Sequence, residues 1–133
     1  MSETATKHKA EAPKSLNFAI LVCSSSRYER LQSSGQVDDP SGDLIAQAIR
    51  RHGHSVVLRE LVPDNRSLID QWMRRALISK GVDAIVTCGG TGISPKDVTI
   101  EAVQPLLEKE LQGFGEALRR LSHEKIGSAA ILT

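Results

Sequence analysis

The fold is decided by residues 83–101, which read Asp-Ala-Ile-Val-Thr-Cys-Gly-Gly-Thr-Gly-Ile-Ser-Pro-Lys-Asp-Val-Thr-Ile-Glu. Its apolar start, residues 84–87, predicts a strand buried on both faces. Glycines at positions 89, 90 and 92 allow a sharp turn and let a ligand approach the backbone amides. Asp97 and Thr99 then mark the expected start of a helix. A strand, a glycine loop and a helix N-terminus predict an anion site, because free amides and the helix dipole point the same way.

The two common phosphate loops are not the explanation for this stretch. Pro95 stands where the dinucleotide fingerprint needs its third glycine, and no Gly-Lys-Ser or Gly-Lys-Thr occurs in the chain. A plain tight turn between a strand and a helix is the alternative interpretation. The three glycines are accompanied by Thr91, Lys96 and Asp97 within nine residues, and this concentration favours the ligand site.

Composition excludes several classes of function. The 133 residues carry a formal net charge of +1, which gives no reason to expect nucleic acid or an anionic membrane as a partner. Aromatic residues make up only 3%, so no platform for stacking bases is expected. Cys23 and Cys88 form no Cys-x-x-Cys pair, and the histidines form no zinc cluster. Reduced thiols and a cytoplasmic location are the simplest interpretation.

The order of elements predicts the fold class. A continuous apolar run predicts a buried strand at residues 18–23, and Val56, Val57 and Leu58 predict a second strand at residues 55–62. Ser41 is the expected N-cap of a helix over residues 43–52, and Asp64 or Asn65 of the next helix. The expected buried stripes are Leu44, Ile45, Ala48 and Ile49 in the first helix, and Leu68, Ile69, Trp72, Met73, Ala76 and Leu77 in the second. This alternation predicts an α/β fold of three layers, a mostly parallel sheet with helices on both faces.

The remaining segments complete the domain. Residues 28–40 are expected to be a long loop, functional or mobile. A short helix is expected at 98–103 and an extended piece at 109–112. A helix at 114–124 and a strand at 126–132 follow. Residues 1–15 lack the apolar core of a signal peptide and are interpreted as a mobile polar tail, so that residues 16–133 form a single domain. No membrane span is expected.

Polar residues follow the predicted strands at the edge of the sheet where ligands bind in open α/β folds. Ser24 and Ser25 follow the first strand, and Asp64 follows the second, on the same edge as Gly89. A solvated serine turn and a helix cap are the alternatives for these positions. Ser41 has the same two interpretations, cap or ligand contact.

The chain resembles the MoaB/MogA family of molybdenum cofactor biosynthesis. The likeness is carried by Gly89-Gly90-Thr91-Gly92, then Lys96-Asp97-Val98-Thr99 and Glu101. Ser41-Gly42, Leu61-Val62-Pro63-Asp64, Pro105, Gly113-Phe114-Gly115 and Ile126-Gly127 also resemble it. The resemblance covers about residues 17–133, and the wording after Gly113 is nearer the MoaB branch.

The resemblance implies a MogA-like molybdopterin-binding domain that adenylylates molybdopterin with Mg-ATP. Asp64 and Asp97 would be catalytic and would bind Mg²⁺. Substrate and nucleotide would be bound by Ser24, Ser25, Ser41, Gly42, Gly89, Gly90, Thr91, Gly92 and Lys96. The family also implies a homotrimer or homohexamer and a molybdenum-insertion partner.

Two departures from the family pattern leave other functions open. Serine stands at position 25, where the family often has aspartate. The chain also stops at Thr133, where family members continue, so a C-terminal part of the fold is expected to be missing. A non-catalytic oligomer that binds pterin or a pathway partner is therefore a second hypothesis. A phosphoryl-handling enzyme like the nucleotide pyrophosphatases among the competence-damage proteins is a third. Molybdenum and tungsten are both open as the metal finally inserted.

Overall fold

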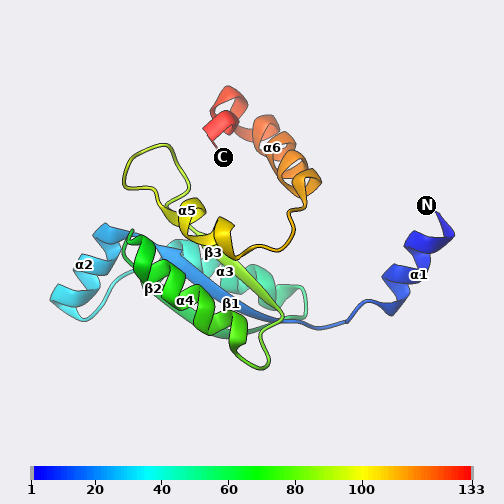
Figure 1. Ribbon diagram of the computed structural model, residues 1–133, viewed down its shortest axis with the longest axis horizontal. Helices are drawn as coiled ribbons and strands as arrows, with labels where there is room; N and C mark the ends of the chain where they lie inside the picture. The colour runs from blue at the N-terminus through cyan, green and yellow to red at the C-terminus, as the bar shows by residue number, and fades with distance from the viewer. Residues whose placement is uncertain (1, 133) are drawn as a thin grey trace.

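A three-stranded parallel sheet forms the centre of the computed structural model, which describes residues 2–132 (Figure 1). The strands are β1 (Asn17–Cys23), β2 (Ser55–Val62) and β3 (Ala84–Cys88), in the order β2-β1-β3. Cys23 pairs with Val62 and Val22 with Cys88, so all three strands end on the same edge of the sheet. The predicted positions of the three strands and their parallel arrangement are confirmed.

Helices cover both faces of the sheet, as the three-layer prediction requires. Ala19, Leu21 and Cys23 of β1 face α4 (Arg66–Ile78) and α5 (Thr99–Val103) in one core cluster. Ile20 and Val22, on the opposite face, pack against α3 (Pro40–Arg51). The side chains of β1 alternate between two apolar layers, and this explains why its sequence is continuously apolar.

Strand β3 is less buried than its sequence predicts. All five of its residues are half-buried, and it lies at the edge of the three-stranded sheet. The expectation that this strand is buried on both faces is therefore wrong for the described residues. An apolar run indicates that a strand prefers burial, but it does not show how many strands and helices pack against it.

Two helices depart from the predicted boundaries. The expected loop at residues 28–40 is mostly helix α2 (Ser25–Ser34), which ends at Gly35 with a φ of 72°. Helix α3 begins at Pro40 with Asp39 as its N-cap, so Ser41 is not the cap. Within the two predicted stripes, Leu44, Ala48, Leu68 and Leu77 are exposed, while Ile49, Ile69, Trp72, Met73 and Ala76 are buried.

The two ends of the described chain are helical and lie away from the sheet (Figure 1). Helix α1 (Glu3–Glu11) has no buried residue. The polar tail therefore contains a helix, and its mobility stays a prediction. After η1 (Gln104–Leu106), the expected extended piece forms no strand, and α6 (Gln112–Ile126) packs on η2 (Gly127–Leu132). The strand expected at residues 126–132 is wrong, since this segment is a 3-10 helix.

Among the residues described, no helix is both long enough and apolar enough to cross a membrane.

Candidate functional site

Two glycines give the loop after β3 its shape. Gly89 and Gly90 have φ values of 90° and 65°, a region that side-chain-bearing residues rarely adopt. A Cβ atom on Gly89 would overlap the carbonyl oxygen of Cys23, and one on Gly90 would overlap Oγ1 of Thr99. Glycine is therefore required at both positions by backbone angle and by space.

Thr99 holds this loop in place. Its Oγ1 donates a hydrogen bond to the carbonyl of Gly89 at 2.9 Å, and its amide donates to the carbonyl of Gly90 at 3.0 Å. The side chain is buried, with 2% of its surface exposed. The sequence marked Thr99 as a helix start and as part of the family motif, but it did not predict this role in holding the loop.

The helix after the loop does not contribute as predicted. Eight residues, 91–98, separate Gly90 from α5, and α5 itself has only five residues. The first amide of α5, that of Thr99, is already bonded to Gly90. A helix dipole aimed at a ligand on the loop is therefore not part of this site, and the anion site of the prediction rests on the loop alone.

Asp97 lies beside Gly92. Its Oδ2 accepts a hydrogen bond from the amide of Ser94 at 3.0 Å, and a Cβ atom on Gly92 would lie 2.7 Å from the same oxygen. Lys96 is exposed and forms no ion pair within the described residues. Thr91, also exposed, lies at the turn between these groups. One carboxylate and one unpaired cation therefore accompany this half of the loop.

Asp64 lies beside the other half. The N-cap of α4 is Asn65, whose side chain accepts from the amide of Leu68 at 3.1 Å, so Asp64 is not the cap. Instead its Oδ2 accepts hydrogen bonds from the amide and the hydroxyl of Ser25, at 2.9 and 2.8 Å. Its Oδ1 would lie 3.0 Å from a Cβ atom on Gly90. The predicted meeting of Asp64 with the glycine loop is present in the structure.

The other predicted site residues have structural partners. Ser24 is the N-cap of α2, and its hydroxyl accepts from the amide of Arg27. Ser41 accepts a hydrogen bond from Arg27 at 3.3 Å. Gly42 is buried, and a Cβ atom there would overlap Asp39. No hydrogen bond or ion pair among the described residues joins Ser41 or Gly42 to the glycine loop.

Asp39 forms an ionic cluster that sequence reasoning missed. Its carboxylate bonds Arg27 at 3.1 Å and Arg59 at 2.7 Å, and it also caps α3 through the amide of Gly42. Burial would raise the pKa of Asp39, but the hydrogen bonds from Arg59 and Gly42 and the charges of both arginines outweigh it and lower that pKa below 3.8. The Asp-Pro sequence before a helix was the available signal, because proline is common at the first helical position.

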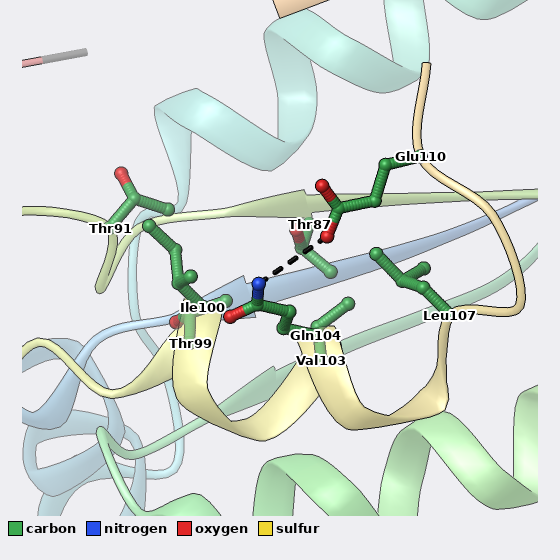
Figure 2. Close-up of a pocket in the computed structure, with 8 residues that line it drawn as sticks. All are labelled: Thr87, Thr91, Thr99, Ile100, Val103, Gln104, Leu107 and Glu110. Carbon is green, nitrogen blue, oxygen red and sulfur yellow. Dashed lines mark hydrogen bonds between the residues drawn. The ribbon is translucent and has the colours of Figure 1, made fainter. Parts of the chain in front are cut away.

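A cavity of about 340 Å³ lies next to the loop, between β3 and α5 (Figure 2). Gln104 donates a hydrogen bond to Glu110 across it at 3.4 Å. Its lining residues are Thr87, Thr91, Thr99, Ile100, Val103, Gln104, Leu107 and Glu110. Thr91 is the one predicted site residue in this lining. Asp64 and Asp97 do not line the cavity, so they and the cavity are separate features.

Cys23 and Cys88 are free thiols. Cys88 pairs with Val22, so it lies on the face of the sheet opposite to Cys23, and the two cannot form a disulfide without rearrangement. Burial is the main cause that raises the pKa of Cys23, which keeps this thiol protonated and unreactive.

The fold and the site define an α/β domain in which a glycine loop lies between two carboxylates at the carboxyl edge of a parallel sheet. Residues 19–133 match the family described as a probable molybdopterin binding domain, and the chain belongs to this family. It is 41% identical to molybdenum cofactor biosynthesis protein B of Bacillus cereus over 129 residues, which span 96% of this chain and 72% of the relative.

Two further comparisons agree with this membership. The chain is 39% identical over 127 residues to a molybdopterin adenylyltransferase of Pyrococcus furiosus, covering 96% of this chain and 70% of the relative. The crystal structure of the tungsten cofactor synthesizing protein MoaB from Pyrococcus furiosus superposes with a TM-score of 0.77 at 37% identity, covering 92% of this chain and 71% of that one. The expected family and its MoaB-like character are confirmed.

Proposed function

We propose that this protein adenylylates molybdopterin with Mg-ATP in the biosynthesis of the molybdenum or tungsten cofactor. The observation that carries the proposal is the placement of Asp64 and Asp97 on either side of one glycine loop, at Gly90 and Gly92. The 39% identity with a molybdopterin adenylyltransferase supports the same reaction. Relatives named for molybdenum and for tungsten are both similar to this chain.

The glycine loop fits a phosphate group. The amides of Gly90, Thr91 and Gly92 donate no hydrogen bond to other described residues, so they are available to phosphate oxygens. Lys96, which is exposed and unpaired among the described residues, would add positive charge on the same loop. We assign the binding of triphosphate oxygens to the loop amides and Lys96.

The two aspartates fit a magnesium ion that arrives with the nucleotide. Within residues 2–132 no group of three or more His, Cys, Asp or Glu could hold a metal by itself. Mg²⁺ usually takes only one or two carboxylates and completes its shell with phosphate oxygens and water. When bound, it would neutralise charge on the phosphates.

The reaction needs positioning and charge stabilisation rather than proton abstraction. An oxygen of the molybdopterin phosphate forms a new bond to the α-phosphorus of ATP, the bond from that phosphorus to the bridging oxygen of the β-phosphate breaks, and pyrophosphate leaves. The attacking phosphate is already ionised, so neither Asp64 nor Asp97 has to act as a base. The chain would supply orientation by the loop and stabilisation by Lys96.

A non-catalytic pterin-binding protein is the second candidate, and one observation favours it. Position 25, where the family often has an aspartate, carries a serine that bonds Asp64. This edge of the sheet therefore has one carboxylate fewer than in relatives with that aspartate. Such a protein would bind molybdopterin without consuming ATP.

The test is an adenylylation assay with α-labelled ATP, Mg²⁺ and molybdopterin. Wild type should release pyrophosphate and form adenylyl-molybdopterin, while Asp97→Asn should lose about 100-fold in turnover because a charge near the phosphates is removed. Asn can still accept the bond from the Ser94 amide, so the fold should persist. Molybdopterin binding without product would instead support the second candidate, and wild-type turnover in Asp97→Asn would remove Asp97 from the mechanism.

We also propose a cytoplasmic location and a homotrimer or homohexamer, with a molybdenum-insertion protein as partner. Two free thiols support a reducing compartment. Large apolar side chains left exposed on α6, among them Phe114 and Leu121, support assembly.

A further inference from the structure

We propose that Ser25 is a positioning residue for Asp64 and does not itself bind a phosphate. This inference rests on the proposed function, because Asp64 is the residue through which Ser25 would act on Mg-ATP. It also revises the expectation that Ser25 contacts the nucleotide.

The hydrogen bonds between the two residues leave Ser25 no donor for a ligand. The Ser25 hydroxyl donates to Oδ2 of Asp64 at 2.8 Å, and the Ser25 amide donates to the same oxygen at 2.9 Å. The hydroxyl also accepts from the amide of Asp64 at 2.9 Å. A serine has one hydroxyl proton and one amide proton, and both are used. A phosphate oxygen needs a donor, so Ser25 would have to release Asp64 to bind one.

The same bonds leave one oxygen of Asp64 available. Oδ2 accepts both donors of Ser25, whereas Oδ1 accepts no hydrogen bond from the described residues and faces Gly90. A carboxylate held by one oxygen has little rotational freedom, and its second oxygen is directed at the glycine loop. Partners that hold a metal-binding carboxylate in this way tune metal affinity through its orientation.

The pairing follows from the register of the sheet. Cys23 pairs with Val62, and the chain leaves both strands at the same edge. The amide of Ser24 bonds the carbonyl of Val62 at 2.9 Å, which extends the pairing by one residue. Ser25 and Asp64 therefore meet because each lies two residues beyond a paired position, and their contact does not depend on a mobile loop.

The experiment compares Ser25→Val with Ser25→Thr, two side chains of nearly equal volume that differ in the hydroxyl. Calorimetric titrations use Mg-ATP and, separately, ATP with excess EDTA. Ser25→Val should weaken Mg-ATP binding by about tenfold, while Ser25→Thr stays within about twofold of wild type. Metal-free ATP should bind all three alike. Ser26→Ala is the matched control, because Ser26 is exposed and bonds Ser24 rather than Asp64.

A double variant separates positioning from direct contact. In an Asp64→Asn background, Ser25→Val should change Mg-ATP binding by less than about twofold, because the group it acts through is already lost. Additive losses, or equal weakening of metal-free ATP, would overturn the positioning role while leaving the proposed function intact. Failure of wild type to bind Mg-ATP would overturn the proposed function, and the inference with it. Thermal melts on each sample show whether a variant is folded, and Ser25→Ala replaces valine if valine unfolds the protein.

Discussion

Asp64 and Asn65 are neighbours in sequence but act in different parts of the structure. Asn65 caps α4 through the amide of Leu68, and Asp64 turns the other way toward Ser25 and the glycine loop. Sequence alone allowed either residue to be the cap, because Asn and Asp cap helices equally well. Because Asn65 is the cap, helix capping does not explain the aspartate at position 64.

Replacing Asn65 should affect stability, whereas replacing Asp64 should affect Mg-ATP binding. Asn65→Ala should lower the free energy of unfolding by about 1 kcal/mol and leave Mg-ATP binding by the folded protein unchanged. Asp64→Asn should keep stability within about 1 kcal/mol, because an amide oxygen can still accept from Ser25, but weaken Mg-ATP binding by about tenfold or more. Urea unfolding and calorimetry on both variants measure the two quantities. Wild-type affinity in Asp64→Asn would show that Asp64 has only a structural role.

Gly90 is the glycine whose replacement should be most costly at the site. In Gly90→Ala the positive φ of 65° costs about 1–2 kcal/mol, and the added methyl group also overlaps Oγ1 of Thr99 and approaches Asp64. Stability and Mg-ATP affinity should both fall. Gly35→Ala is the control, since Gly35 has a φ of 72° but nothing within 4 Å of the added atom. It should lose stability alone, and an equal loss of affinity in Gly35→Ala would contradict a specific role for the loop.

At the scale of the elements, the Asp39 cluster joins three of them. Arg27 comes from α2, Arg59 from β2, and Asp39 itself begins α3. The Asp39 side chain has 11% of its surface exposed, so its two ion pairs are better shielded from water than ordinary surface pairs. This cluster fixes the start of α3 against the sheet and accounts for Ser41 and Gly42 without a ligand.

The contribution of Asp39 should depend on pH in a defined direction. Its pKa in the folded protein lies below the ordinary 3.8, so the stabilisation is present above about pH 4 and is lost as the pH falls through the lower, folded value. At pH 6, Asp39→Asn should lower the free energy of unfolding by about 1–2 kcal/mol, and the difference from wild type should shrink below pH 4. Urea unfolding at several pH values measures it. Asp43→Asn, which removes a 70% exposed carboxylate from the same Arg59, should cost less than about 1 kcal/mol. A difference that is constant with pH would contradict the assigned cause.

Some elements were predictable and others were not, for physical reasons. The three strands were predictable because each contains neighbouring apolar residues, although only β1 is largely buried, while β2 is mostly exposed and β3 is half-buried. Helix α2 was missed because its serines are typical of loops, although Ser24 and Gly35 at its ends were cap signals in the sequence. The apolar run near the end of the chain was expected to be a strand. A short run cannot distinguish a strand from a helical turn unless the pairing partner is known.

At the scale of the whole molecule, the candidate site was partly predictable. Parallel strands place their carboxyl ends on one edge, so the approach of Asp64 to the loop at Gly90 followed from the order of elements. The bonds between Ser25 and Asp64 were not predictable, because they follow from the register that pairs Cys23 with Val62, and the sequence does not show that register. The helix dipole was expected to contribute to the site. It does not, because residues 91–98 separate Gly90 from α5, and α5 has only five residues.

The assembly is the last property to be tested, and it concerns the whole chain. We expect a homotrimer or homohexamer, with a mass three or six times the 14.4 kDa of one chain. The described structure leaves Phe114, Leu118, Leu121 and Ile126 of α6 exposed, with 73% of the Phe114 surface accessible. Several large apolar side chains exposed on one helix are typical of an interaction site. Light scattering coupled to size exclusion, over a dilution series at micromolar concentration, measures the mass. A single species of 14.4 kDa at every concentration would contradict the prediction, whereas a mass that falls on dilution toward one chain would show a weak assembly of the same kind.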